Sequence, residues 1–319
     1  MAVSVSQDSR TVIRKEGRIR RYFRVGYKHR YVYLLVIPGF LYFIIFKLAP
    51  MWGLLIAFKD YNPYKGIMQS SWVGFRYFLD FFESPFFYMM LRNTLVISLM
   101  DIVFYFPAPI LLALLLSEIK SKKFRSLNQT IVYMPHFLSW VVISGITFFL
   151  LSSDVGLVNK FIVHNGGDPI AFLSNPKLFW WVILSQNVWK EVGWGTILFL
   201  ASISQIDPVQ YEASTIDGAS RLQKLWYITI PSIMPTVIVL LILRLGNLMD
   251  VGFEQVLLMG NPYVRNVAEV FDVYSFNQGI NNGNFSIAIA VGMFKSVVGL
   301  VMVVISNTVV KRMGHSGIY

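Results

Sequence analysis

Residues 206–231 read IDPVQYEASTIDGASRLQKLWYITIP, a polar stretch that separates two long apolar runs. Asp207 and Pro208 favour a helix start, because the carboxylate accepts hydrogen bonds from free amides and proline suits the first helical position. Gly218 is expected to end that helix, since a residue without a side chain tolerates the left-handed cap conformation. A second short helix is expected over residues 219–227. The stretch therefore predicts a bent helix pair outside the membrane, with small side chains that allow another protein to approach closely: Ala213 and Ser214.

Composition places the chain among integral membrane proteins. Of its 319 residues 55% are hydrophobic and only 14% are charged, which is far from the averages of soluble domains. The formal net charge is +11, but the basic residues are not gathered in a folded basic domain with interleaved aromatic residues, so a nucleic-acid partner is not expected. The absence of cysteine excludes disulfides, thiolate catalysis and thiolate metal sites.

Six apolar runs are long enough to cross the membrane, since a helix needs about 20 residues to span the hydrocarbon. The majority of the 28 Lys and Arg residues fall in segments expected inside, which predicts that both termini are cytoplasmic. The predicted spans cover about residues 31–58, 87–117, 129–151, 178–205, from after Pro231 to 258, and 286–310.

Residues 1–30 are interpreted as a basic cytoplasmic arm and residues 31–319 as the membrane domain. The arm is expected to lie against anionic lipid headgroups or to stay solvated. The apolar run that follows it is too long for a removed signal peptide and is expected to anchor the chain. Segments 59–86, 152–177 and 259–285 are predicted to lie outside.

Polar side chains inside the spans should face a protein interior or a water-filled path, because ionisable groups are costly in hydrocarbon. Spacings of three and four residues place them on one helical stripe in the fourth span and on another in the fifth. We interpret these stripes as the wall of a path for a hydroxyl-rich solute. Ion pairing between helices is the alternative for any single residue. The expected path residues are Asn187, Lys190, Glu191 and Trp194 on the fourth span, Asn247, Asp250 and Glu254 on the fifth, and Lys295 on the sixth.

Enzymatic chemistry finds little support in the sequence. The four histidines are scattered, and His136 is expected to be interfacial or packed rather than a ligand. No catalytic residue and no metal site is predicted, because no nucleophile elbow or metal-ligand spacing occurs. A phosphate-binding loop is also absent, so any ATP must be bound by another polypeptide. A membrane-embedded enzyme and an ion-coupled secondary transporter remain as alternatives, although the repeated halves common in such transporters are not visible.

The stretch at 206–231 resembles the signature of the membrane permeases of binding-protein-dependent ABC importers. That signature runs Glu-Ala-Ala, three residues, Gly, nine residues, Ile, one residue, Leu-Pro, and this chain departs from it at Ser214 and Ile230. Three further runs, at 133–142, 189–194 and 252–255, are similar to permeases of the complex-carbohydrate group. The signature positions here are Glu212, Ala213, Ser214, Gly218, Ile228, Ile230 and Pro231.

The resemblance implies an all-α, type I importer permease core of five to six helices in a bacterial cytoplasmic membrane. It also implies a second permease subunit, an extracytoplasmic solute-binding protein and a cytoplasmic ATPase dimer, which binds ATP and Mg²⁺, so this chain itself needs no cofactor. The implied solute is an oligosaccharide or polysaccharide fragment, neutral or acidic. In such permeases this loop docks into a groove of the ATPase. The residues expected to make that contact are Tyr211, Glu212, Ala213, Ser214, Asp217 and Gly218.

Overall fold

The computed structural model describes residues 29–314 and 317–318, and its long elements are all helices. The basic arm predicted at residues 1–30 therefore lies outside the described residues, apart from its last two. Two compact units make up the chain, residues 1–55 and residues 56–319.

The first long helix is apolar on all sides, as expected of a helix surrounded by lipid. It begins as α2 (Arg30–Phe43), in which no residue is buried, and continues as the π-helical η1 (Ile44–Leu48) and the 3-10 helix η2 (Ala49–Phe58). Its 29 residues are long and apolar enough to cross a membrane. The prediction of a first span at residues 31–58 is confirmed in length and apolarity.

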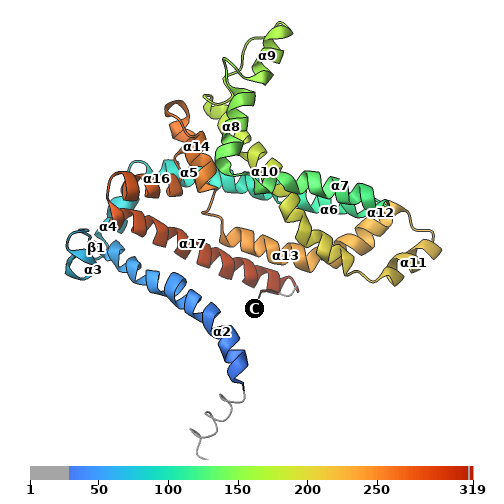
Figure 1. Ribbon diagram of the computed structural model, residues 1–319, viewed down its shortest axis with the longest axis horizontal. Coiled ribbons are helices and arrows are strands. Elements are labelled where there is room, and N and C mark those ends of the chain that lie inside the picture. The colour runs from blue at the N-terminus through green and yellow to red at the C-terminus, as the bar shows by residue number, and fades with distance from the viewer. Residues whose placement is uncertain (1–28, 315–316, 319) are drawn as a thin grey trace, which may run out of the picture. The chain divides into compact units, whose positions relative to one another are not determined.

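Three more helices of the described residues meet the same criteria of length and hydropathy: Phe87–Ser117, Arg221–Gly246 and Phe285–Arg312. The first of these consists of α5 (Phe87–Met100), the π-helical η3 (Asp101–Tyr105) and α6 (Pro107–Ser117), and the last is α17. α13 (Ile230–Gly246) lies beside α17 (Figure 1). Gly299 permits this close packing, because a Cβ there would be only 2.5 Å from the carbonyl oxygen of Gly246.

The predicted third span, residues 129–151, is not a straight helix. α7 (Lys122–Tyr133) and the 3-10 turn η4 (Met134–Phe137) are followed by α8 (Trp140–Leu151), which leaves at an angle of 100°. Ser139 caps α8, because its hydroxyl accepts a hydrogen bond from the amide of Val142. The predicted span is therefore not one continuous helix, since this cap starts a new helix within the apolar run. If the bent pair counts as one span, the described residues contain five candidate spans.

The helix of the predicted fifth span starts earlier than expected. α12 (Arg221–Lys224), the π-helical η5 (Leu225–Thr229) and α13 follow one another without interruption. The helix therefore passes through Pro231 instead of stopping before it. A π-helical turn just before the proline accommodates its missing amide hydrogen.

The same helix also ends earlier than expected, at Gly246 instead of residue 258. Residues 247–252 are non-helical, and a separate short helix, α14 (Phe253–Met259), follows them. The prediction that Asn247, Asp250 and Glu254 share one helical stripe was therefore wrong. Gly252 adopts a left-handed conformation, with φ of 72°, at the start of α14, which is a helix boundary that periodicity alone does not reveal.

α10 (Pro176–Ser204) is a single helix of 29 residues that packs against α6, α7 and α13. It matches the predicted fourth span in position. It is long enough to cross a membrane, but it is less apolar than the four helices that are candidate spans. Glycine allows its close contact with α7, because a Cβ at Gly193 would collide with the carbonyl group of Val132. The polar residues predicted to share a stripe on the fourth span therefore lie on one uninterrupted helix.

Short elements fill the segments between the long helices. Two apolar clusters, one around Phe179 and Val256 and one around Phe81 and Phe271, hold those at residues 76–82 and 253–276. The elements are the antiparallel pair β1 (Lys59–Asp60) and β2 (Ser71–Trp72), α3 (Gly66–Gln69), α4 (Arg76–Phe82), α9 (Leu157–His164), α11 (Pro208–Ile216), η6 (Pro262–Val264), α15 (Arg265–Ala268), α16 (Phe271–Phe276) and η7 (Asn277–Asn281).

Candidate functional site

The hairpin formed by α11 and α12 has the local structure that its sequence predicts. The side chain of Asp207 accepts a hydrogen bond of 2.9 Å from the amide of Val209, and Pro208 occupies the first turn of α11. Gly218 has φ of 75° and reverses the chain just after α11 ends. These observations confirm the predicted start of the first helix and its glycine stop.

Hydrogen bonds between its two arms make the hairpin a closed unit. The ammonium group of Lys224 donates to the Thr215 hydroxyl at 2.6 Å, and the hydroxyls of Tyr211 and Thr229 lie 2.9 Å apart. At the turn, Ser220 and Gln223 form a reciprocal capping box. The spacing of these two residues in the sequence indicates a capping box, but it was not predicted.

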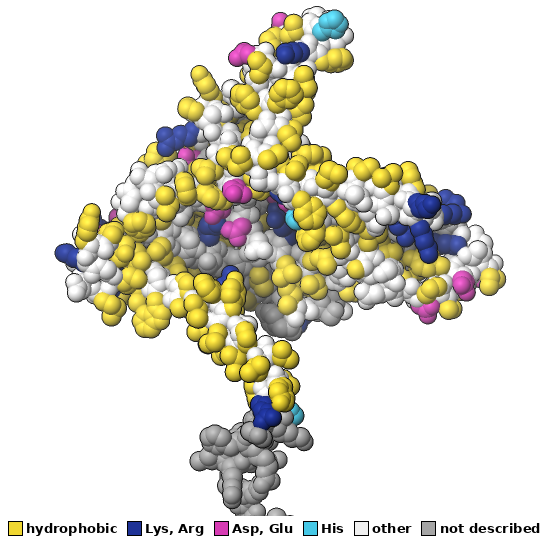
Figure 2. Space-filling model, viewed as in Figure 1, with side chains coloured by type: hydrophobic (Ala, Val, Ile, Leu, Met, Phe, Trp, Pro, Cys, Tyr) yellow, Lys and Arg dark blue, Asp and Glu magenta, His cyan; other side chains and the backbone are white. Residues whose placement is uncertain are grey.

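The outer surface of the hairpin has no cover within the described part of the chain, and α11 contains no buried residue. Apolar side chains are exposed there, with Ile216 at 87%. Figure 2 shows Lys and Arg side chains gathered at the end of the molecule where Figure 1 places α12. Such a surface suits a protein partner. Of the predicted coupling residues, Glu212, Ala213, Asp217 and Gly218 are exposed, whereas Tyr211 and Ser214 are partly buried.

A polar cavity of about 280 Å³ lies between η3, α8, α10 and the segment that follows α13. Three of the predicted path residues line it together, namely Asn187, Glu191 and Asp250. Two aromatic rings, those of Tyr105 and Trp140, also face it. Its other polar lining groups are Asp101, Arg244 and Gln255.

Asp101 and Arg244 form an ion pair at this cavity. The Asp101 side chain is only 7% exposed and accepts a second hydrogen bond, of 2.9 Å, from the amide of Asn187. The guanidinium of Arg244 lies over the ring of Tyr105, 5.9 Å from its centroid. Asp101, Tyr105 and Arg244 were not among the predicted path residues. Asp101 and Arg244 are charged residues inside predicted spans, and the rule that such residues are functional candidates would have identified both.

Lys190 and Glu191 belong to a second network, which fixes the bend between η4 and α8. Lys190 donates to the backbone oxygen of His136 at 2.6 Å, and its ammonium lies 3.3 Å from the Glu191 carboxylate. The imidazole of His136 lies 2.7 Å from that carboxylate and stacks on Trp194, with the ring centroids 4.3 Å apart. With a side chain only 8% exposed, Lys190 serves helix pairing, and His136 is a packed residue.

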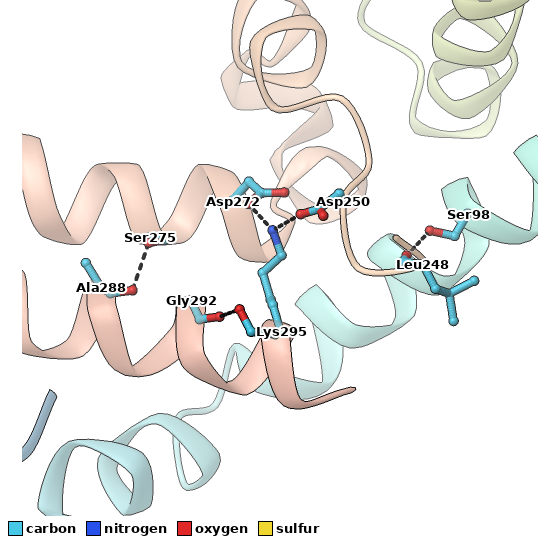
Figure 3. A network of polar contacts seen from close by, with 9 residues as sticks. Ser98, Leu248, Asp250, Asp272, Ser275, Ala288, Gly292 and Lys295 are labelled. Carbon is cyan, nitrogen blue, oxygen red and sulfur yellow. Dashed lines mark hydrogen bonds and ion pairs between the residues drawn. The ribbon is translucent and has the colours of Figure 1, made fainter. Parts of the chain in front are cut away.

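Lys295 is a third paired cation. Its ammonium contacts Asp250, at 2.6 Å, and Asp272 on α16 (Figure 3). The Lys295 side chain is 10% exposed, whereas that of Asp250 is 64% exposed. Burial raises the pKa of the Asp272 carboxyl, and the neighbouring Lys295 ammonium opposes this rise. Lys295 therefore stabilises a carboxylate pair and does not extend a free charge into the polar cavity.

The two remaining predicted path residues lie elsewhere. Asn247 lines a groove of about 350 Å³ between α13 and α17, together with Asp250 and Lys295. Glu254 is exposed on α14 and does not line the polar cavity. The described residues contain no group of three His, Asp or Glu side chains that could hold a metal ion.

Residues 105–315 match the family described as "Binding-protein-dependent transport system inner membrane component". The chain belongs to this family and is an inner-membrane transport subunit rather than an enzyme. Family membership leaves the ion-coupled secondary transporter without support.

The chain is similar to two proteins of Bacillus subtilis (strain 168) over nearly its whole length. It is 49% identical to Protein LplB over 292 residues, which are 92% of each chain. It is 45% identical to the polygalacturonan/rhamnogalacturonan transport system permease protein YteP over 308 residues, which are 97% of this chain and 96% of that one.

A solved structure shows the same fold. It is the crystal structure of a bacterial alginate ABC transporter in complex with an alginate pentasaccharide-bound periplasmic protein. One of its chains superimposes with a TM-score of 0.85 and 38% sequence identity, which covers 93% of this chain and 100% of that chain. The expectation of an ABC importer permease fold is thereby confirmed.

Proposed function

We propose that this chain is the permease subunit of an ABC importer for oligosaccharides or polysaccharide fragments. The observation that carries the proposal is the polar cavity, where amide, carboxylate and guanidinium groups lie beside Tyr105 and Trp140. Sugars combine hydroxyl groups with apolar ring faces, and sites that bind small molecules pair a few polar groups with aromatic walls. The relatives named for polygalacturonan and rhamnogalacturonan and for alginate support this solute class.

The charges around the cavity select neither neutral nor acidic sugars by themselves. Arg244 is paired with Asp101, Lys190 lies beside Glu191, and Lys295 contacts two carboxylates. Only Arg244 lines the polar cavity as a cation, with a side chain 28% exposed. Because a guanidinium carries five N–H donors, it retains donors for a sugar hydroxyl or a uronate carboxylate.

The proposed topology has six spans with both termini in the cytoplasm. It counts the bent pair of α7 and α8 as one span and α10 as another. α10 is long enough to cross, and its polar groups face the other helices and the cavity, which offsets its lower apolarity. This topology places the hairpin of α11 and α12 on the cytoplasmic side.

The proposed partners follow from this topology. The hairpin docks onto a cytoplasmic ATPase dimer that binds ATP and Mg²⁺, so this chain holds no cofactor. The exposed signature residues Glu212, Ala213 and Gly218 make that contact, and Tyr211 and Ser214 support it from within the hairpin. A second permease subunit completes the path, and a solute-binding protein delivers the sugar outside.

Reconstitution in proteoliposomes with the partner permease, the ATPase and the binding protein tests the proposal. We expect ATP-dependent uptake of an oligosaccharide from a panel of neutral and uronate-containing glycans. Arg244→Lys should lower uptake while leaving binding to the isolated solute-binding protein unchanged. Failure of every glycan, with uptake of a different solute such as a peptide or an inorganic ion, would contradict the carbohydrate assignment.

A further inference from the structure

Three helices meet at a chain of side-chain hydrogen bonds beside the polar cavity. On α14, the amide of Gln255 donates to the backbone oxygen of Ile183 at 2.7 Å and to Oε1 of Gln186 at 2.9 Å. On α10, Nε2 of Gln186 donates to the hydroxyl of Thr147, on α8, at 2.6 Å, and to Sδ of Met259 at 3.3 Å. Gln255, Gln186 and Thr147 are all buried, and of these three only Gln255 lines the polar cavity.

The direction of these bonds is fixed by a backbone carbonyl at each end, because a carbonyl oxygen can only accept. The Thr147 hydroxyl donates to the oxygen of Ile143 at 2.9 Å, so it has to accept from Gln186. At the other end, Gln255 has to turn its NH₂ group to the Ile183 oxygen. A reversed Gln255 amide would set its oxygen against two other oxygens that have no hydrogen to share. The amide oxygen of Gln255 therefore points away from the chain of bonds.

This amide oxygen remains as an acceptor at the cavity. It accepts no hydrogen bond from any described residue, although both N–H groups of the same amide are used. The described residues whose unpaired polar side-chain atoms are fully enclosed are Thr94, Arg125 and Ser144, so the oxygen of Gln255 is not enclosed. Gly252 also lines the cavity and has no side chain to cover this oxygen, whereas a Cβ there would lie 3.2 Å from it. The oxygen is therefore open to the cavity.

Asn187 lines the same cavity and adds a second acceptor of this kind. Its NH₂ group donates to the Asp101 carboxylate at 2.9 Å, which turns its amide oxygen away from that carboxylate. Arg244, which is paired with Asp101, can only donate. A sugar hydroxyl can donate to an amide oxygen, whereas a carboxylate has no hydrogen to give and would be repelled. The side of the cavity at Gln255 therefore suits hydroxyl groups.

We propose that Gln255 is a specificity-determining residue whose fixed amide oxygen accepts a hydrogen bond from a sugar hydroxyl in the polar cavity. The inference rests on the proposed function, which makes this cavity part of the solute path. Gln186 and Thr147 are positioning residues, because they hold the Gln255 amide without lining the cavity. The part of the solute that lies against Gln255 is the hydroxyl-bearing edge of a sugar ring and not a carboxylate.

The test combines a change in the protein with a change in the solute. Uptake of trigalacturonate, a uronate-containing glycan of the panel, is measured in the reconstituted complex beside uptake of its monodeoxy derivatives, each of which lacks one ring hydroxyl. The natural complex should prefer trigalacturonate to one of these derivatives. In Gln255→Met, which has a similar size but no acceptor, that ratio of uptake rates should fall about five- to tenfold, as expected for the loss of one hydrogen bond. The same binding protein serves every assay, so its own preference cancels when the two ratios are compared.

Thr147→Val is the control for a structural role, because it shortens the chain of bonds but leaves both bonds of the Gln255 amide in place. It should keep the natural ratio, whatever its effect on the amount of assembled complex. An unchanged ratio in Gln255→Met would overturn the proposal, since a residue that only joins helices slows all solutes alike. A Thr147→Val complex that changes the ratio as much as Gln255→Met would overturn it as well, because the effect would then come from helix packing.

Gly252→Ala is a second variant, which keeps the test decisive if Gln255→Met does not assemble. Its added Cβ covers the Gln255 oxygen at 3.2 Å without removing any bond of the chain. The ratio should fall in this variant too, and a natural ratio would count against the proposal.

Failure of this inference can be distinguished from failure of the proposed function. If the natural complex takes up a different glycan of the panel, that glycan and its monodeoxy derivatives serve as the probes. Uptake of a glycan with the same ratio in every variant would refute only the role of Gln255. If the natural complex takes up no glycan at all, the carbohydrate assignment fails and this inference fails with it.

Discussion

The coupling hairpin and the polar cavity are built in opposite ways. The hairpin is held by contacts between residues close in sequence, such as Asp207 with Val209 and Lys224 with Thr215. The cavity depends on pairs far apart in sequence, such as Asp101 with Arg244 and His136 with Glu191. The hairpin should therefore tolerate the loss of one bond, whereas a single change at the cavity should leave a buried charge without its partner.

The largest effect is expected at the buried ion pair of the cavity. Asp101→Ala removes one partner and leaves Arg244 partly buried without its counter-charge, which should destabilise the protein by about 3–5 kcal/mol. Thermal unfolding of the purified complex measures this loss. The double variant Asp101→Asn, Arg244→Gln should recover part of it.

Glu254→Gln is the matched control for that experiment, since Glu254 is an exposed carboxylate near the same region. Its effect should stay within about 0.5 kcal/mol. Equal thermal stability of the Asp101→Ala and Glu254→Gln complexes would show that the cavity does not depend on its ion pair.

A smaller but still large effect is expected where α10 meets α7. In Gly193→Ala the added Cβ would collide with the carbonyl group of Val132, so overpacking should lower stability by about 1–3 kcal/mol. Gly145→Ala on α8 is the control, because its added Cβ would have no other part of the fold within 4 Å beyond its own helix backbone and chain neighbours. It should leave stability unchanged or raise it by up to about 1 kcal/mol. A Gly193→Ala complex as stable as the control would argue against close contact of these helices.

In the hairpin, Gly218→Val should strain the turn by about 1–2 kcal/mol, because a β-branched residue avoids the left-handed conformation that Gly218 adopts. We expect the spans to stay folded while ATP hydrolysis stimulated by loaded binding protein falls. Gly218→Asn should behave almost like the natural protein, since asparagine tolerates this conformation. Normal stimulation in Gly218→Val would show that the shape of the turn is not needed for coupling.

The smallest effect is expected at the cap of α11. Asp207→Ala removes one exposed hydrogen bond to the amide of Val209 and should destabilise the hairpin by about 1 kcal/mol. Asp207→Asn keeps an acceptor and should be close to neutral. Stimulated ATP hydrolysis of the two variants is measured at increasing temperature. A loss of stability as large as that of Asp101→Ala would contradict the view that local contacts hold the hairpin.

The sequence predicted what local chemistry determines. The cap at Asp207, the turn at Gly218 and the long apolar helices follow from residue types and their spacing. The breaks at Ser139 and after Gly246 were missed, because an apolar run continues through each of them and periodicity does not show where a cap or a left-handed glycine interrupts it. The predicted stripe on α10 lies on one continuous helix, but only Asn187 and Glu191 of its four residues line the polar cavity.

Pairing across the fold could not be predicted. Asp101 and Arg244 are separated by 143 positions, and nothing in the spacing of either residue identifies the other. The same holds for Lys295, which was predicted to contact the solute but is saturated by two carboxylates. A polar residue inside a span marks an important position, but its role depends on tertiary contacts that one sequence does not display.

Cross-linking from the hairpin tests the central claim most directly, namely that this hairpin connects the spans to a cytoplasmic ATPase. An Ala213→Cys variant carries the only thiol of this subunit, on the exposed surface of α11. In the assembled complex, we predict that a thiol-to-amine cross-linker joins it to the ATPase subunit and that a membrane-impermeant thiol reagent added outside intact cells does not reach it. Labelling from outside, or cross-linking to the solute-binding protein instead, would contradict the account.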